Sequence, residues 1–271
     1  MKFDSNRAWK EASEAIAANR DVLSAIAGVF ILIPTLAFSL LFPQPQPPAG
    51  ADPDAIMAQM QAFYVSALPW LIPVAIVQGA GTMALLTLFT DRTRPTVGEA
   101  IRRGFASIIP YLLAQLLLGI GIGIIGGALL ALAALTGVNA LVAVVLIAIG
   151  LGAIYTAVKT SLSSAVIAVE GERNPVSALR RSWQLTRGNS GRIAMFYLLV
   201  AVAFIVVMMV VMALIGMLLA LLLDGETATA VATVFSSFLS TAMTVYFVGI
   251  IAAIHRQLAG PSAQQVMSTF E

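Results

Sequence analysis

Long apolar runs recur along the whole chain, and they restrict its folding more than any other feature. A helix needs about 20 consecutive apolar residues to cross the roughly 30 Å hydrocarbon layer of a bilayer. Only 10% of the 271 residues are charged, against about 25% in soluble domains. The sequence therefore predicts an all-α, polytopic membrane protein with six transmembrane helices, near residues 22–42, 67–90, 110–135, 140–169, 193–223 and 230–258.

Basic residues are concentrated on one side of the predicted spans. Of the 15 lysines and arginines, all except Lys159 fall in the N-terminal segment, in the loops after the second and fourth spans, or at the C-terminal end. The opposite loops, residues 43–66, 136–139 and 224–229, contain neither lysine nor arginine. Because cytoplasmic loops carry the excess of basic residues, we expect both termini in the cytoplasm.

The three predicted cytoplasmic segments share one plan, a charged helix-forming stretch that leads into a pair of spans. Residues 100–105 read Ala-Ile-Arg-Arg-Gly-Phe and residues 178–183 read Ala-Leu-Arg-Arg-Ser-Trp, which match in chemistry at every position. The segment that begins at Ala8 is a weaker third copy. We therefore predict a single integral membrane domain over 1–271, built from three parallel repeats at about 4–90, 95–169 and 174–258, with a cytoplasmic tail at 259–271.

Apolar and basic residues recur at helical spacing within these segments, which is typical of amphipathic helices at the bilayer interface. Thr96, and either Asn174 or Ser177, are suited to cap the second and third of these helices. One interpretation is that the helices are topological anchors that join the hairpins. The other is that they recognise anionic lipid head groups or dock a second membrane protein. The candidate interface residues are Arg102, Arg103, Arg180, Arg181, Trp183 and Arg187.

Residues 174–189 read Asn-Pro-Val-Ser-Ala-Leu-Arg-Arg-Ser-Trp-Gln-Leu-Thr-Arg-Gly-Asn. This stretch resembles a cytoplasmic motif of a bacterial family, the membrane domain found ahead of some glycerophosphodiester phosphodiesterases, together with its stand-alone six-span relatives. The resemblance implies a multi-pass protein of the bacterial inner (plasma) membrane. The phosphodiesterase barrel needs histidines and paired carboxylates, whereas this chain has one histidine, so we expect kinship without that activity.

Composition excludes several kinds of chemistry. The chain has no cysteine and one histidine, which excludes cysteine-based and histidine-rich metal sites. We also expect no metal site, no cofactor and no nucleic-acid partner. Residues 121–126 spell Gly-Ile-Gly-Ile-Ile-Gly, but the dinucleotide-binding pattern needs a preceding strand, and here it lies inside an apolar run. Gly119, Gly123 and Gly127 share one helix face, which favours close packing against a neighbouring helix.

Lys159 is the one charged residue within a predicted span, and intramembrane charges are costly enough to suggest a function. Two interpretations stay open: the side chain extends to the cytoplasmic interface, or it binds an anionic group such as a lipid phosphate. Ser163 follows on the same helix face, and Gln78 and Gln115 lie on other spans at broadly similar depth. These four residues form the candidate ligand site.

We predict a non-enzymatic membrane protein that binds lipid, with anionic head groups as partners, or that has an accessory role beside another membrane protein. The alternative is a transporter of small solutes or lipids that uses Lys159. A membrane-embedded enzyme would need a convergent acid–base pair, which the predicted spans do not offer. His255 ends the last span and is predicted to lie at the interface, and residues 53–66 are predicted to form a short surface helix on the outer side.

Overall fold

The computed structural model describes all residues except 1, 44, 46–49, 51, 91–95 and 261–271, so most of the predicted tail lies outside the described residues. All regular secondary structure in the described residues is helical, which confirms the all-α prediction. In chain order the helices are α1 (Ser5–Ala18), α2 (Arg20–Ala27), the π-helix η1 (Gly28–Leu32), α3 (Ile33–Leu41), α4 (Pro53–Thr90), α5 (Val97–Ala134), α6 (Asn139–Thr160), α7 (Ser163–Ala165), the π-helix η2 (Val166–Glu170), α8 (Pro175–Leu185), α9 (Ser190–Leu222) and α10 (Gly225–Ala259).

Six segments are long and apolar enough to cross a membrane, which confirms the predicted number of candidate spans. They are Arg20–Leu41, Pro53–Thr90, Val97–Ala134, Asn139–Glu170, Ser190–Leu222 and Gly225–Ala259. The first span combines α2, η1 and α3, and the fourth combines α6, α7 and η2. The chain is therefore a candidate multi-pass membrane protein.

Two predicted surface helices are continuous with spans. Residues 53–66 form the first part of α4, and the amphipathic segment from Val97 forms the first part of α5. Pro69 and Pro73 lie inside α4, and Pro110 lies inside α5. Each proline removes one backbone hydrogen bond, but membrane helices tolerate this loss where neighbouring groups satisfy the freed carbonyl. The predicted boundary between a separate outer helix and the second span is therefore wrong.

Polar residues begin several helices as expected from capping chemistry. Thr96 accepts a hydrogen bond from the backbone of Glu99, and the Glu99 side chain accepts one from the Thr96 N–H. Asn174, rather than Ser177, caps α8 by accepting from the N–H groups of residues 176 and 177. At the start of α10, hydrogen bonds from the Thr227 side chain and backbone hold the pKa of the exposed Asp224 carboxyl below its ordinary value.

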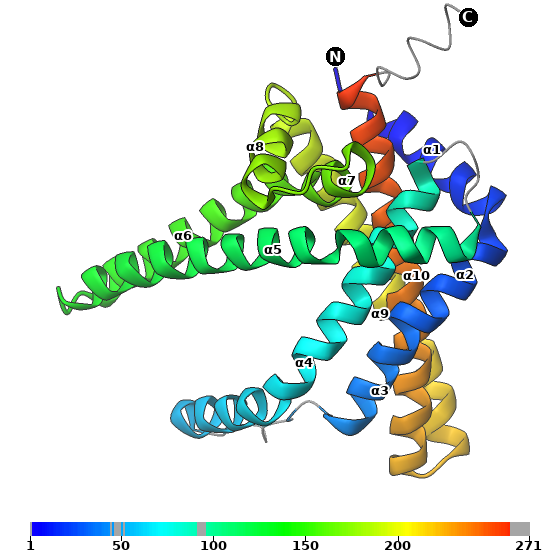
Figure 1. The fold of residues 1–271 in the computed structure, drawn as a ribbon. Helices are drawn as coiled ribbons and strands as arrows, with labels where there is room; N and C mark the ends of the chain where they lie inside the picture. The colour runs from blue at the N-terminus through cyan, green and yellow to red at the C-terminus, as the bar shows by residue number, and fades with distance from the viewer. Residues whose placement is uncertain (1, 44, 46–49, 51, 91–95, 261–271) are drawn as a thin grey trace, which may run out of the picture.

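The helices diverge from one end of the molecule. Figure 1 shows the pairs α3–α4, α5–α6 and α9–α10 pointing in different directions from the end where α1, α7 and α8 lie. We call this end the hub, and define it as α1, α7, η2, α8, the first turns of α5, the end of α6 with the loop that follows it, and the C-terminal parts of α4 and α10. In the most apolar part of α10, 56% of residues are buried, against 6% in the spans of α6 and α9, so α10 is central and those two face outward. Side chains with no measurable exposure meet in the hub: Met83, Leu86, Leu162, Ile250 and Ile254.

Glycines permit the closest helix approach at the crossing of α4 and α5. A Cβ atom added at Gly104 would lie 2.6 Å from the backbone oxygen of Ala80 and 3.1 Å from the Ala84 Cβ. At Gly119, Gly123 and Gly127, an added Cβ would meet no atom within 4 Å in the described part of the chain. The predicted packing face on α5 therefore has no described partner helix within this chain, and it stays a prediction for a helix from elsewhere.

Candidate functional site in the hub

The fourth span is interrupted between α6 and α7, and α8 packs against the interruption. A helix that stops leaves backbone groups without helical partners. The Ser182 hydroxyl donates to the Lys159 carbonyl at 2.8 Å and accepts from the Leu162 N–H at 3.1 Å. The Thr186 hydroxyl also donates to the Lys159 carbonyl, at 3.4 Å. Ser182 and Thr186 are fully buried, so two hydroxyl groups of α8 stabilise the break.

Lys159 lies at this break and is only 4% exposed. Its Nζ atom is 5.2 Å from the centre of the Trp183 ring and 5.8 Å from that of Tyr155. The two rings meet edge to face, with 5.8 Å between their centroids, and both are exposed at the molecular surface. Ring faces attract a cation, but they do not replace hydrogen-bond acceptors or a counter-charge.

Within the part of the chain that the structure describes, the Lys159 ammonium has no counter-charge. Among the described residues, no acidic side chain lies within 4.0 Å of it, and no hydrogen-bond acceptor is in place for its three N–H groups. An ammonium with little access to water is stabilised by an acceptor or a counter-charge. The arrangement is therefore suited to an acceptor supplied from outside the chain, at the surface where the two rings are exposed.

The other predicted ligand residues have separate locations. Ser163 is buried at the start of α7, directly beyond the break. The Gln78 amide donates to the Thr35 hydroxyl at 2.9 Å, which links α4 to α3. The Gln115 amide is 3.5 Å from the Tyr111 hydroxyl on its own helix. Of the four residues, Lys159 and Ser163 thus share the hub, while the two glutamines are engaged with other partners.

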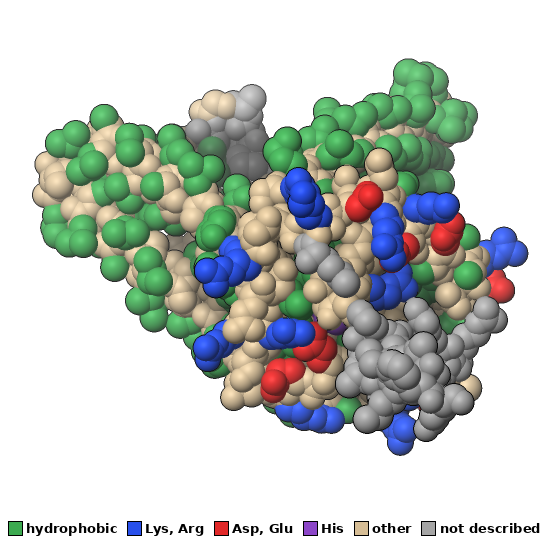
Figure 2. Space-filling model, turned by 90° about the horizontal axis from the view of Figure 1, so that it is seen from above, with side chains coloured by type: hydrophobic (Ala, Val, Ile, Leu, Met, Phe, Trp, Pro, Cys, Tyr) green, Lys and Arg blue, Asp and Glu red, His purple; other side chains and the backbone are tan. Residues whose placement is uncertain are grey.

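The predicted interface residues gather on the hub face. Figure 2 shows the basic and acidic side chains on this face, and apolar side chains covering the parts that project away from it. Arg102, Arg103, Arg180 and Arg187 are exposed, and Trp183 is 42% exposed. Arg181 differs from them, because its Nε atom donates to Glu170 at 3.1 Å.

Glu170 connects two helices that the sequence alone did not pair. Its second oxygen lies 3.0 Å from Nε2 of His255 on α10, while the first pairs with Arg181 on α8. His255 is 3% exposed, so it is buried among the helices of the hub, and its predicted depth at the interface stays a prediction. The residues stand 85 positions apart, and no local pattern joins them. The sequence indicated only that both residues lie at the end of a span on the same predicted side of the membrane.

Other long-range contacts join further helices of the hub. Arg256 donates to the Phe89 carbonyl at the end of α4, at 3.1 Å, and lies 3.3 Å from the Glu11 carboxylate on α1. The N-terminal residues are also bound, since the Phe3 N–H donates to the side chain of Asn189 at 2.9 Å. No cluster of three or more metal-ligating side chains occurs among the residues that the structure describes.

These features define a class of helical, multi-pass membrane protein with a polar hub at one end of its spans. Residues 10–258 match the family described as a domain of unknown function, DUF7847, and the chain belongs to that family. The match includes all six candidate spans except the last residue of α10. Comparison with curated proteins and with solved structures gives no match.

Proposed function

We propose that this protein is a non-enzymatic protein of the bacterial inner membrane that binds anionic lipid, alone or as an accessory to another membrane protein. The hub faces the cytoplasm in this proposal, because 14 of the 15 basic residues precede or follow spans on that side. The observation that carries the proposal is the buried Lys159 ammonium, which has two exposed aromatic rings beside it and no counter-charge within the described residues.

A lipid phosphate is the acceptor that best suits this position. Tyr and Trp side chains favour the bilayer interface, because one part of each ring system is apolar and another part is polar. Tyr155 and Trp183 are both exposed, and Lys159 lies beside them at the end of α6. A phosphate oxygen at this point would accept from the ammonium while the acyl chains follow the apolar surface of α6.

The proposed architecture is three parallel repeats arranged in a closed ring. Small residues at matching positions of the three amphipathic segments are all buried: Ala8 and Ala12, Ala100 and Gly104, Ala178 and Ser182. Each pair packs on the second span of the preceding repeat. Gly104 faces α4, Ser182 contacts the break after α6, and the Ala12 Cβ would lie 3.6 Å from a Cβ built at Gly249 of α10. The third contact closes the ring, because α10 belongs to the last repeat and α1 to the first.

Kinship with the membrane domain of glycerophosphodiester phosphodiesterases remains part of the proposal, on the strength of residues 174–189. Phosphodiesterase activity is not part of it. The Glu170–His255 pair is a carboxylate and an imidazole in contact, but Arg181 also donates to both Glu170 oxygens, at 3.1 and 3.4 Å. This arrangement favours a structural link between η2, α8 and α10.

Transport is the second candidate, and it needs a polar route that includes Lys159. The separate partners of Gln78 and Gln115 support it less than the single-site lipid proposal. Tightly packed apolar residues at the centre of the hub, such as Leu86 and Ile254, also do not favour a polar route along the axis of the molecule.

The test is native mass spectrometry of the protein extracted from its own membrane, beside the variant Lys159→Ala. We expect wild type to retain a defined anionic lipid and Lys159→Ala to lose it, with the affinity weakened about tenfold or more, since one charge-assisted contact contributes about 1.5–3 kcal/mol.

Lys10→Ala is the matched control, because Lys10 is a highly exposed lysine of α1 and its one ion pair, with Glu14, is long at 3.9 Å. Lys159→Arg keeps the positive charge but changes the shape of the side chain, so it tests which of the two lipid retention requires. Equal lipid retention by wild type and Lys159→Ala, with both variants folded, would contradict the proposal.

A further inference from the structure

Arg173 reaches from the loop before α8 to the middle of α5. Its Nη1 atom donates to the carbonyl of Ala106 at 3.0 Å. In an uninterrupted helix that carbonyl would accept from the N–H four residues later, but residue 110 is proline and has no N–H. Arg173 therefore replaces the missing donor, and this hydrogen bond holds its guanidinium group against α5.

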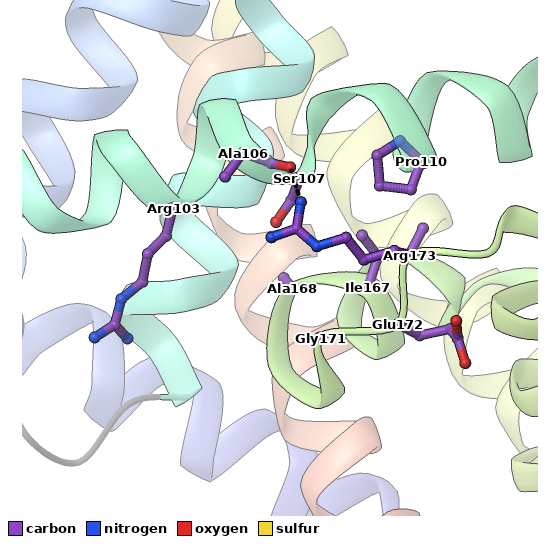
Figure 3. Close-up of a pocket in the computed structure, with 9 residues that line it drawn as sticks. All are labelled: Arg103, Ala106, Ser107, Pro110, Ile167, Ala168, Gly171, Glu172 and Arg173. Atoms are coloured by element: carbon purple, nitrogen blue, oxygen red, sulfur yellow. Dashed lines mark hydrogen bonds between the residues drawn. The ribbon is translucent and has the colours of Figure 1, made fainter.

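Arg173 is exposed and lines a surface cavity of about 170 Å³. Figure 3 shows that Arg173 extends across it toward α5, from which Ser107 and Pro110 also line it. Ile167 and Ala168 of η2 supply the opposite apolar wall, and Gly171 shapes the loop with a φ of 71°. The lining of the cavity thus combines residues of both charges, Arg103, Arg173 and Glu172, with Ser107 and apolar walls.

The positive charge of Arg173 is not neutralised within the described part of the chain. No described acidic side chain lies within 4.0 Å of its guanidinium group. The neighbouring Glu172 is directed away from it in Figure 3, and its carboxylate accepts from the Asn174 N–H at 2.8 Å. Since the Ala106 carbonyl occupies one nitrogen, the planar fork retains donors for an anion.

The cavity lies where α5 changes from its charged amphipathic part to its apolar part. Arg102 and Arg103 precede it along the helix, and an apolar run follows from Pro110. This position corresponds to the depth of lipid head groups if α5 crosses a bilayer. Arginine is favoured for phosphate because its planar N–H groups match two phosphate oxygens.

We propose that this cavity binds the phosphate group of an anionic phospholipid, with Arg173 and Ser107 as donors and the acyl chains along the apolar surface of α5. The site is separate from Lys159, which lies at the contact of α6 with α8. The class of ligand rests on the lipid-binding function proposed above, but different residues form this site.

The experiment must separate loss of binding from loss of folding, because Arg173→Gln removes the donor to Ala106. Pro110→Ala restores a helical N–H for that carbonyl. The double variant Arg173→Gln/Pro110→Ala is therefore expected to keep the stability of α5 while losing the guanidinium. Pro110→Ala alone serves as its parent, and Arg20→Gln, at a highly exposed arginine of α2, controls for general surface charge.

Delipidated full-length protein in detergent micelles is titrated with phosphatidylglycerol, phosphatidylcholine or inorganic phosphate, and bound molecules are counted by native mass spectrometry. We expect Arg20→Gln to bind phosphatidylglycerol as wild type does, and Pro110→Ala sets the reference affinity for the double variant. In the double variant, one phosphatidylglycerol site is expected to weaken by about tenfold or more.

Wild-type binding by a folded double variant would overturn the proposal. Equal affinity for phosphatidylcholine would overturn the preference for anionic lipid, and saturation by inorganic phosphate in place of phosphatidylglycerol would overturn the lipid as the source of the phosphate. Lys159→Ala, measured in parallel, distinguishes the two sites. Loss of a lipid site in the Arg173 series alone would support this cavity and contradict the Lys159 site. Loss of a lipid site in Lys159→Ala alone would support the Lys159 site and contradict this cavity.

Discussion

Buried polar side chains of the hub mostly bind groups of other helices. Ser182 of α8 bonds both sides of the break after α6, and Asn189 accepts from the backbone of Phe3. Each such bond joins segments that are distant in the sequence. Lys159 and Arg173 differ, because each retains a positive charge without an acidic partner among the described residues. A positive charge without an acidic partner therefore distinguishes these two candidate ligand residues from the polar side chains that only join helices.

Ser182→Ala tests the structural role of a single hydroxyl. It leaves the Leu162 N–H without a partner. The Lys159 carbonyl then keeps only the longer hydrogen bond, 3.4 Å, from the Thr186 hydroxyl. Unsatisfied buried groups cost about 1–3 kcal/mol each, so we expect a loss of about 2 kcal/mol or more in the free energy of unfolding. Sodium dodecyl sulfate titration in mixed micelles, followed by circular dichroism, measures it.

Ser236→Ala is the matched control, because the Ser236 hydroxyl bonds only to the Thr233 carbonyl within α10. We expect its effect to be below about 1 kcal/mol. If the two variants unfold at the same detergent fraction, the hydroxyl of Ser182 does not stabilise the break.

The elements are long helices whose crossings depend on small residues. At the α4–α5 crossing, Gly104 lies against the backbone of α4, whereas Gly123 further along α5 faces open space in the described structure. The same residue type on one helix thus has two different surroundings. Glycine spacing alone does not distinguish them, because spacing reports a shared face and not the partner opposite it.

Gly104→Ala and Gly123→Ala form a matched pair for this crossing. The added Cβ at residue 104 would approach the Ala80 carbonyl oxygen to 2.6 Å and the Ala84 nitrogen to 3.0 Å, which requires the helices to separate. Overpacking costs about 1–3 kcal/mol, so we expect Gly104→Ala to lower the free energy of unfolding by that amount. Gly123→Ala should be neutral. The same micelle titration compares them, and a neutral Gly104→Ala would contradict the observed crossing.

The whole molecule is held together at one end. Glu170 joins η2 to α8 and α10, and Arg256 joins α10 to α4 and α1, while the outer parts of the helix pairs diverge (Figure 1). Loss of one link should therefore loosen the hub without unfolding the spans.

Glu170→Ala tests this organisation. It removes the carboxylate that both Arg181 and the buried His255 contact, and about 1–3 kcal/mol of local stability is expected to go with it. Hydrogen exchange should accelerate in α8 and in the last turns of α10, and stay unchanged in α9. Glu172→Ala, in the same loop, removes one bond to the Asn174 backbone and serves as the control. Equal exchange in both variants would show that Glu170 does not link the helices.

The sequence by itself determined the helical class, the six candidate spans and the cap at Thr96, and it narrowed the cap of α8 to Asn174 or Ser177. Each of these follows from local chemistry, because apolar length and capping act within one stretch of chain. It also singled out Lys159, whose charge is unusual in any apolar run. The continuity of α4 escaped prediction, because two prolines in an apolar environment bend a helix without ending it.

Only the tertiary structure decided which polar residues meet. Glu170 and His255 pair across 85 positions, and Arg173 finds the Ala106 carbonyl 67 positions away. It also separated Gln78 and Gln115 from Lys159, although all three lie on predicted spans. Depth in a membrane follows from the order of residues along one helix, whereas contact depends on the rotation and crossing of several helices. Those are set by packing at sites such as Gly104 and Ser182, where side chains of different helices meet.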